Sequence, residues 1–233
     1  MNQSASWLRR HYIKLLILFG GVLAPLYLFG MLAEDVVEKE IFPFDKPILL
    51  FVHSHASPML DAVMIFFTRA GSAFALVPFN ILVFLYLLRR RNRMQARMQA
   101  VFWVLAVAGA ALLNGLAKHV FARIRPEFWV SALPETTFSF PSGHAMQSMA
   151  VAAGLVVLAW HSRWRWPVAL IGACFVFLVG LSRVYLGVHF PSDILAGWAA
   201  SLAWVIGLSV LFRDALQQRR RGGTSVDASP AVH

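Results

Sequence analysis

The residues best suited to chemistry lie in a short stretch, residues 182–193, between two apolar segments of the chain. Asp193 follows His189 by four positions, and Arg183 precedes both. A carboxylate bonded to one imidazole nitrogen fixes the tautomer and raises the basicity of the ring, which leaves the other nitrogen free to attack or to bind. Ionisable groups at membrane depth are costly, so their presence here indicates a functional site.

A second stretch, residues 140–147, reads FPSGHAMQ and leads into another apolar segment. Pro141 and Ser142 suit a helix start, with Ser142 as the N-cap, and Gly143 permits close backbone approach. The free N–H groups of such a helix start favour a phosphate, beside which His144 would lie. A lone histidine at a segment end is more often an interfacial hydrogen-bonding residue, so this stretch alone does not make His144 a catalyst.

A third stretch, residues 118–126, places Lys118 and Arg125 at the end of an earlier apolar segment, ahead of Pro126. Two fixed cations at this spacing can hold one multiply charged anion, and arginine supplies a planar fork of donors. Snorkelling at the membrane interface explains one such cation, but it explains poorly why several converge from three stretches.

The tripeptide Phe-Pro-Ser occurs twice, at 140–142 and at 190–192, each time directly before an apolar segment. Two helices are therefore expected to present their positive N-terminal ends on the same side of the membrane. Together with Lys118, Arg125 and Arg183, these ends predict a phosphate site. Such a set suits phosphoryl transfer, in which positioning and charge stabilisation provide most of the catalysis.

A metal site is the alternative use of the two histidines. Asp193 follows His189 at a spacing that suits metal ligands, and His144 would complete a set. Several Arg and Lys side chains around the site would repel a cation, so neither a metal nor another cofactor is expected. The His-Ser-His stretch at 53–55 has no nearby cysteine or carboxylate partner and is interpreted as an interfacial segment.

The composition of the 233-residue chain is that of an integral membrane protein. Hydrophobic residues make up 59% and charged residues 14%, with a mean hydropathy of +0.65, whereas a soluble domain carries roughly 45–50% and 25%. About 20 apolar residues cross a bilayer core of about 30 Å as a helix. The apolar runs predict an all-α bundle of six transmembrane helices, at residues 13–32, 72–88, 100–117, 144–160, 167–182 and 194–212.

No linker, repeat or break in composition divides the chain, so residues 1–219 are predicted to form one membrane domain. The polar segment 220–233, rich in small residues, is predicted to be a disordered cytoplasmic tail. The first apolar run is long for a signal sequence and no small-residue cleavage site follows it, so it is expected to remain as a span. The single cysteine, Cys174, lies inside an apolar run and is expected to be buried.

The distribution of basic residues predicts the orientation. Fourteen of the 21 Lys and Arg fall on one side if the chain crosses six times, and nine of the eleven acidic residues fall on the other. The positive-inside rule places the basic side, with both termini, in the cytoplasm, so the phosphate site faces the periplasm of a bacterial cell. The net charge of +10 is clustered between apolar runs, as topology determinants are, and no nucleic-acid partner is expected.

The three stretches, taken in order, resemble the signature of the type 2 phosphatidic acid phosphatase superfamily of membrane lipid phosphatases. That signature reads K-x6-R-P, then P-S-G-H, then S-R-x5-H-x3-D. Here it corresponds to Lys118–Pro126, Pro141–His144 and Ser182–Asp193, with every spacing matched. Each motif alone is a weak signal, but the ordered set is specific.

The resemblance implies a role for each motif residue. His189 would be the nucleophile that takes the phosphoryl group as a phosphohistidine, and Asp193 would orient and activate it. His144 would be the general acid for the leaving oxygen and then the base for the hydrolytic water. The phosphate would be bound, without a metal, by Lys118, Arg125, Ser142, Gly143 and Arg183.

Within this superfamily, the short six-span form resembles the bacterial phosphatidylglycerophosphatase B and undecaprenyl pyrophosphate phosphatase group. The implied function is hydrolysis of a lipid phosphate or pyrophosphate in the bacterial inner membrane, on undecaprenyl pyrophosphate, phosphatidylglycerol phosphate or phosphatidic acid. The same motifs fit a lipid phosphotransferase or a lipid A phosphatase. An anion transporter is a more distant alternative, because transport sites usually lie at mid-membrane, where the spans here are apolar.

Two further sets of residues remain open in the sequence. Arg123, inside the first motif, is interpreted either as an extra phosphate contact or as a snorkelling cation. Thr68, Arg69 and Gly71, ahead of the second span, either line a lipid headgroup site or cap a helix.

Overall fold

The structure, a computed structural model, describes residues 12, 16, 18–39, 42–90, 93–213 and 216. All regular secondary structure in these residues is helical, which confirms the all-α fold class. The predicted tail 220–233 lies outside the described residues. In chain order the elements are the π-helical turn η1 (Phe19–Leu23), α2 (Ala24–Val37), α3 (Asp45–Ser54), α4 (Pro58–Ala70), α5 (Ala73–Leu88), α6 (Arg93–Phe121), α7 (Gly143–Ala159), α8 (Arg165–Tyr185) and α9 (Pro191–Leu211).

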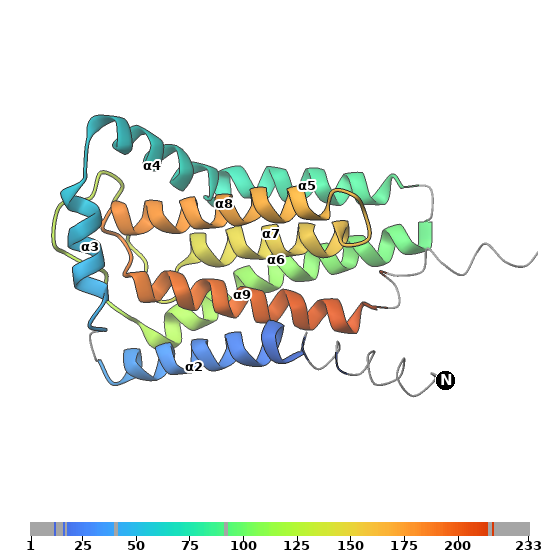
Figure 1. Cartoon of the computed structure of the whole chain (residues 1–233), viewed down its shortest axis with the longest axis horizontal. Helices are drawn as coiled ribbons and strands as arrows, with labels where there is room; N and C mark the ends of the chain where they lie inside the picture. Colours follow the sequence, from blue (N-terminus) through green and yellow to red (C-terminus); the bar gives the residue numbers. More distant parts are fainter. Residues whose placement is uncertain are drawn as a thin grey trace, which may run out of the picture.

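The long helices α2 and α5 to α9 run side by side along the long axis of the molecule (Figure 1). α7 packs against α6, α8 and α9, so it forms the centre of the bundle. α3 lies across one end, and the loop 122–142, which joins α6 to α7, lies at the same end (Figure 1). We call this end the site end: α6 and α8 finish there, and α7 and α9 begin there.

The predicted spans coincide in position with helices of the bundle. Within the described part of the chain, four helices are long and apolar enough to cross a membrane, at Phe19–Val37, Met94–Phe121, Arg165–Tyr185 and Pro191–Leu211. α4 and α5 together make a fifth candidate, bent by 46° at a short break. α7 is apolar but has only 17 residues, so by length it falls short of the sixth crossing that the sequence predicted.

α7 is short because it starts inside the bundle. Asn114, on α6, donates a hydrogen bond from Nδ2 to the carbonyl oxygen of Pro141 (3.0 Å), just ahead of α7. Since α6 continues to Phe121, the start of α7 lies about two turns below the end of its neighbour. The first turn of α7 is therefore enclosed by the surrounding helices.

The helices at the site end begin at residues that satisfy their first N–H groups. Ser142 caps α7, where its side chain accepts a hydrogen bond from the N–H of Ala145. In α9, Pro191 occupies the first position, and the side chain of Asp193 accepts from the N–H of Phe190 (2.9 Å). These contacts pair groups that a helix start otherwise leaves free.

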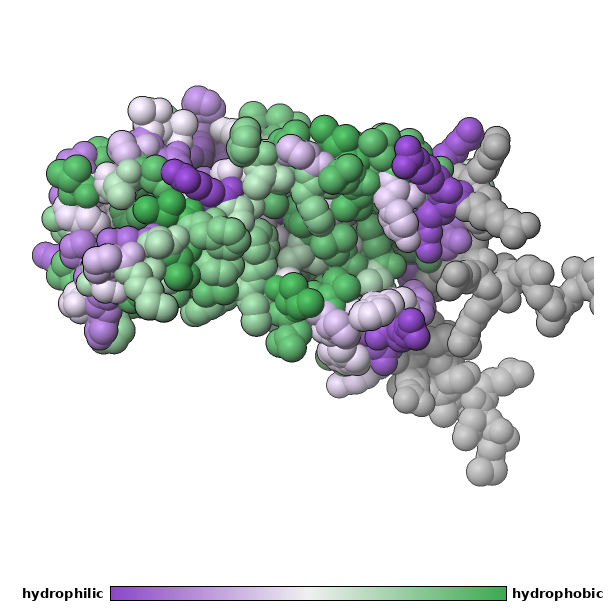
Figure 2. Space-filling model, turned by 90° about the horizontal axis from the view of Figure 1, so that it is seen from above, coloured by the Kyte–Doolittle hydropathy of each residue, from purple (hydrophilic) through white to green (hydrophobic). Residues whose placement is uncertain are grey.

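The surface has the pattern of a membrane-spanning bundle. Figure 2 shows a hydrophobic band across the middle of the face in view, with hydrophilic residues gathered toward both ends. Cys174 is exposed, so its predicted burial is wrong. Its side chain lies on a face of α8 that no other helix covers, and such a face of a membrane helix is apolar because it meets lipid.

A glycine lets α9 approach the start of α7. A Cβ added at Gly197 in α9 would lie 3.0 Å from the Cβ of Ala145 and 3.0 Å from the carbonyl oxygen of Ser142. Small residues commonly permit such close helix packing in membrane proteins. Gly197 thus allows the N-terminal ends of the two site helices to meet.

Gly197→Ala should destabilise the protein, because the added methyl group must push α9 away from the start of α7. We expect a loss of about 1–3 kcal/mol, the usual range for overpacking, observed as a lower Tm in detergent. Gly207→Ala, on the same helix, is the matched control, since a Cβ added there meets no atom within 4 Å. Equal Tm values for the two variants would contradict this packing account.

Candidate functional site

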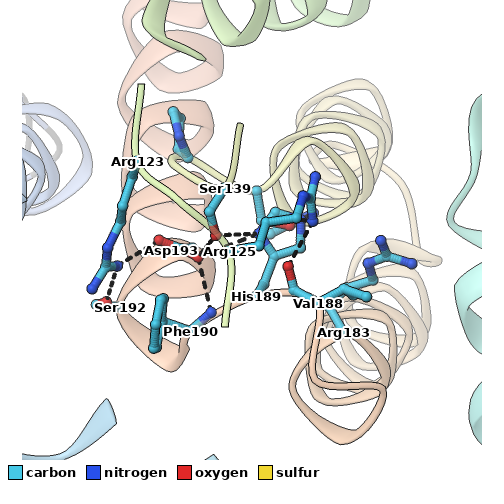
Figure 3. A network of polar contacts seen from close by, with 12 residues as sticks. Arg123, Arg125, Ser139, Arg183, Val188, His189, Phe190, Ser192 and Asp193 are labelled. Atoms are coloured by element: carbon cyan, nitrogen blue, oxygen red, sulfur yellow. Dashed lines mark hydrogen bonds and ion pairs between the residues drawn. The ribbon is translucent and has the colours of Figure 1, made fainter. Parts of the chain in front are cut away.

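The predicted motif residues converge at the site end of the bundle. Arg183 lies in the last turn of α8, Asp193 in the first turn of α9, and His189 in the short link between these helices. Figure 3 shows Arg125 beside His189, and Arg123 on the opposite side of Asp193. Both arginines come from the loop 122–142.

His189 and Asp193 form a buried pair. Nδ1 of His189 lies 3.3 Å from Oδ2 of Asp193, and the two side chains are 1% and 0% exposed. Across the ring, Nη1 of Arg125 lies 3.1 Å from Nε2 of His189. A guanidinium can only donate, so Nε2 is the acceptor and the proton of the neutral ring is assigned to Nδ1, toward Asp193. Nε2 therefore keeps its electron pair.

Burial keeps the His189 ring neutral. Desolvation lowers the pKa of His189 from 6.5 to about 4, although the hydrogen bond and charge of Asp193 act in the opposite direction. The nearby charges of Arg125 and Arg183 lower this pKa as well. The imidazole is unprotonated at neutral pH, which is the state that a nucleophile requires.

Several donors fix the carboxylate of Asp193. Besides His189, Oδ2 accepts from the N–H of Phe190 (2.9 Å) and from the hydroxyl of Ser139. Oδ1 accepts from Nη1 of Arg123 (2.6 Å). A buried carboxylate needs such partners because leaving water without them is strongly unfavourable. They hold Asp193 in one orientation toward the imidazole.

Lys118 and Arg125 converge on one segment of the loop. Nζ of Lys118 donates to the hydroxyl of Thr137 and to the carbonyl oxygen of Phe138, each at 2.8 Å. Arg125 donates from Nε to the carbonyl oxygen of Thr137 (2.6 Å) and from Nη1 to that of Val188 (2.6 Å). The two cations predicted from the first motif therefore share a partner and face the same region.

Arg183 reaches this region from α8 and is 2% exposed. Its Nη1 donates to the hydroxyl of Thr68 (2.5 Å), and its Nη2 pairs with Oε1 of Glu135. The other oxygen, Oε2 of Glu135, lies 3.7 Å from Nη2 of Arg125. Burial alone would raise the pKa of Glu135, but the two arginines hold it below its ordinary value. An ionised carboxylate thus bridges two predicted phosphate-binding cations.

The start of α7 completes the cluster. The N–H of Ser142 donates to the carbonyl oxygen of Asp193 (3.1 Å), which ties α7 to the first turn of α9. Gly143 and His144 form the first turn of α7 next to this contact. His144 is half-buried and close enough to Glu135 for their charges to interact. The structure therefore gathers all eight predicted site residues at one end of the bundle.

Arg123 is neither an extra phosphate contact nor a snorkelling cation, the two roles that the sequence suggested. Its side chain is 11% exposed, and its guanidinium pairs with Asp193 (2.6 Å) and with Asp45 of α3 (2.9 Å). Both terminal nitrogens are thus bound to buried carboxyl groups, so the partners of Arg123 are Asp193 and Asp45 instead of a phosphate or the membrane interface. The sequence interpretation missed Asp45 entirely, because no motif includes it.

Other neighbours of the site were also missed. Thr68, one of the residues left open, binds Arg183 instead of capping a helix. Glu135, Thr137 and Ser139 lie in the loop 122–142, where neither periodicity nor a turn signal marks them. Their polarity and their place between the first two motifs were the only available signals.

The donor set of this site suits an anion. Within the described residues, no group of three or more His, Cys, Asp or Glu side chains is arranged to hold a metal ion. Three cations face the region next to His189, against the single carboxylate of Glu135. They come from α6, the loop and α8, as Lys118, Arg125 and Arg183.

The sequence profile of the PAP2 superfamily matches residues 99–217, which contain all three motif stretches. This match covers just over half of the chain. The chain therefore belongs to the PAP2 superfamily.

Similar proteins agree with this assignment. The undecaprenyl-diphosphatase of Sulfolobus acidocaldarius is 28% identical over 209 residues, which cover 87% of this chain and 92% of that protein. Phosphatidylglycerophosphatase B of Bacillus subtilis is 32% identical over 150 residues, which cover 62% and 71%. The crystal structure of a transmembrane PAP2 type phosphatidylglycerolphosphate phosphatase from B. subtilis matches with a TM-score of 0.72 and 27% identity, over 85% of this chain and 98% of that one. The helical membrane fold and the phosphatase class are thereby confirmed.

Glu135→Gln should strengthen the binding of inorganic phosphate, because it removes the charge that Arg183 and Arg125 now share. For a partly exposed ion pair we expect a gain of roughly threefold in affinity, measured by calorimetry on the purified protein. Glu127→Gln is the matched control: it removes one charge from an exposed residue of the same loop. Unchanged or weaker binding in Glu135→Gln, relative to this control, would contradict competition between the carboxylate and phosphate.

Proposed function

We propose that the protein is a metal-independent hydrolase of membrane lipid phosphates or pyrophosphates, acting through a phosphohistidine at His189. The observation that carries this proposal is the buried His189–Asp193 pair, whose Nε2 electron pair faces the guanidinium of Arg125. A phosphate oxygen bound to that guanidinium would bring phosphorus within reach of the nitrogen. Because His189 is neutral, no base is needed to activate it.

In the first step, Nε2 of His189 attacks phosphorus, and the bond from phosphorus to the lipid oxygen breaks. His144, when protonated, donates its proton to that leaving oxygen, so the lipid departs as a neutral alcohol or as a phosphate with one fewer phosphoryl group. The Nδ1–H of His189 stays hydrogen-bonded to Asp193, whose charge stabilises the positive ring that forms. The cations and the free N–H groups at the start of α7 bind the phosphoryl oxygens.

In the second step, water attacks the phosphorus of the phosphohistidine. His144, now neutral, takes a proton from this water, and the P–N bond breaks with its electron pair returning to Nε2 of His189. Inorganic phosphate is released and both histidines regain their starting states. Positioning and charge stabilisation account for most of the catalysis in phosphoryl transfer, which fits a site of fixed cations and helix ends.

The proposed substrates are undecaprenyl pyrophosphate, phosphatidylglycerol phosphate and phosphatidic acid. The names of the two relatives support the first two, and the third is also a phosphomonoester, carried directly on diacylglycerol. A lipid phosphotransferase or a lipid A phosphatase of this fold would use the same motif residues. An anion transporter fits less well, because the charged cluster lies at one end of the bundle.

We further propose that the site faces the periplasm from the bacterial inner membrane, with both termini in the cytoplasm. The turns at the other end of the bundle, α5 to α6 and α7 to α8, carry basic residues and no acidic ones within the described chain. Under the positive-inside rule that end is cytoplasmic. Residues 1–219 would form one membrane domain.

Phosphate release tests the hydrolase directly. The purified protein, in detergent with excess EDTA, should release inorganic phosphate from at least one of the three proposed substrates. His189→Ala should lower kcat at least about 10³-fold because it removes the nucleophile. His161→Ala, an exposed histidine at the other end of the bundle, is the control and should keep full activity.

Each other outcome of that assay has a distinct meaning. Full activity in His189→Ala would refute the nucleophile assignment. Loss of wild-type activity in EDTA would refute metal independence. Release that occurs only when an acceptor lipid is added, with the phosphoryl group found on that lipid, would identify a phosphotransferase.

Thiol labelling in intact cells tests the orientation. In a Cys174→Ser background, Val130→Cys in the loop 122–142 should react with a membrane-impermeant reagent, since Val130 is 98% exposed. Ser162→Cys, in the turn between α7 and α8, should react only after the cells are permeabilised. The reverse pattern would place the site in the cytoplasm.

A further inference from the structure

We propose that Arg123 and Asp45 are positioning residues that set the orientation and charge of Asp193, and through it the reactivity of His189. This inference rests on the proposed function of His189 as nucleophile. Neither residue touches the region in which a phosphate would bind. Each acts through the catalytic carboxylate, from the side opposite the imidazole.

The first support is the geometry of Arg123. Nη1 donates to Oδ1 of Asp193 (2.6 Å) and Nη2 to Oδ2 of Asp45 (2.9 Å). The two carboxyl groups are each 0% exposed, so one guanidinium is shared between two buried acidic side chains. His189 faces the other oxygen of Asp193 (Figure 3). Asp193 is thus held between an arginine on one side and the imidazole on the other.

The second support is the way in which Asp45 grips the start of α9. Its Oδ1 accepts from the N–H of Ser192 (2.9 Å) and its Oδ2 from the hydroxyl of Ser192 (2.6 Å). Ser192 directly precedes Asp193 and also accepts a hydrogen bond from Nη1 of Arg123 (2.7 Å). α3 therefore fixes Asp193 twice, once through the backbone of α9 and once through the arginine.

The third support is the shielding of the arginine. The guanidinium of Arg123 lies 4.2 Å from the ring centroid of Phe190 and 5.8 Å from that of Phe42. Aromatic faces attract a cation and keep water from it. In such surroundings each charged contact is stronger than at an open surface, so the orientation of Asp193 depends on these partners.

The charges also favour the chemistry. Asp193 presents its negative charge to His189, and Asp45 is a second carboxyl group on the far side of Arg123. The imidazole becomes positive when its Nε2 bonds to phosphorus, so a correctly oriented Asp193 stabilises the transition state more than the neutral ground state. Removing Asp45 or Arg123 loosens Asp193 in that orientation, so either change should lower kcat and leave phosphate binding almost unchanged.

The test measures kcat, KM and inorganic phosphate affinity for full-length Asp45→Asn, Arg123→Lys and Arg123→Met. We expect kcat to fall about 10-fold to 100-fold in Asp45→Asn and Arg123→Met. This is the range seen when residues that orient the metal-binding side chains of an enzyme are removed. KM and phosphate affinity should stay within about twofold, because only the transition state is affected. Arg123→Lys keeps the charge and should recover part of the loss in kcat.

Asp61→Asn is the matched control. Asp61 also lies in the segment ahead of the second span and accepts a hydrogen bond, from Tyr185 (2.5 Å), but has no contact with Asp193. This variant should keep the wild-type kcat. If Arg123→Met does not fold, the kcat values of the near-isosteric Asp45→Asn and of the charge-conserving Arg123→Lys still test the inference.

The Asp193→Asn background shows whether Asp45 acts through Asp193. There, adding Asp45→Asn should lower kcat by no more than about twofold, because coupled residues are not additive. An equal loss in both backgrounds, a loss confined to KM or phosphate affinity, or full kcat in Asp45→Asn would each overturn the inference. An inactive wild-type protein would instead refute the proposed function, so the two failures are distinguishable.

Discussion

The buried negative charge of Asp193 is the constraint on which the arrangement of the site end depends. A carboxylate with no exposed surface is stable only if each oxygen has donors. The loop 122–142 supplies Ser139 and Arg123, the start of α9 supplies the N–H of Phe190, and the α8–α9 link supplies His189. Segments distant in sequence must therefore meet at one residue. The geometry of the proposed site follows from satisfying this charge.

The cations pose the opposite problem. Lys118, Arg125 and Arg183 repel one another when they face the same region, and the protein itself compensates them. Carbonyl oxygens of the loop accept from Lys118 and Arg125, and the carboxylate of Glu135 pairs with both arginines. A substrate phosphate would replace some of these partners. The affinity for phosphate then depends on how much stronger the contacts of the cations with phosphate are than their present contacts with the protein. This difference is smaller than the total strength of the phosphate contacts.

The features that the sequence predicted are local, and those that it missed are not. Ser142 as an N-cap and Asp193 four residues after His189 are patterns within a single turn, and apolar runs mark the helices. By contrast, Asp45 and Arg123 are 78 residues apart, and Thr68 and Arg183 are 115 apart. Nothing in one sequence indicates such pairs. The short length of α7 was missed for the same reason, because it depends on how deeply that helix sits beside α6.

The depth of α7 also explains how a highly charged site exists in an apolar bundle. Its first turn lies about two turns below the end of α6, beneath the loop 122–142 and beside α3. There the cations are stabilised by carbonyl oxygens, a carboxylate and the C-terminal ends of α6 and α8 in place of bulk water. A phosphate carried by a lipid can enter this layer while its apolar chain stays along the hydrophobic band of Figure 2. A dissolved phosphate ester with a polar leaving group has no such partner, so the geometry favours a substrate held in the membrane.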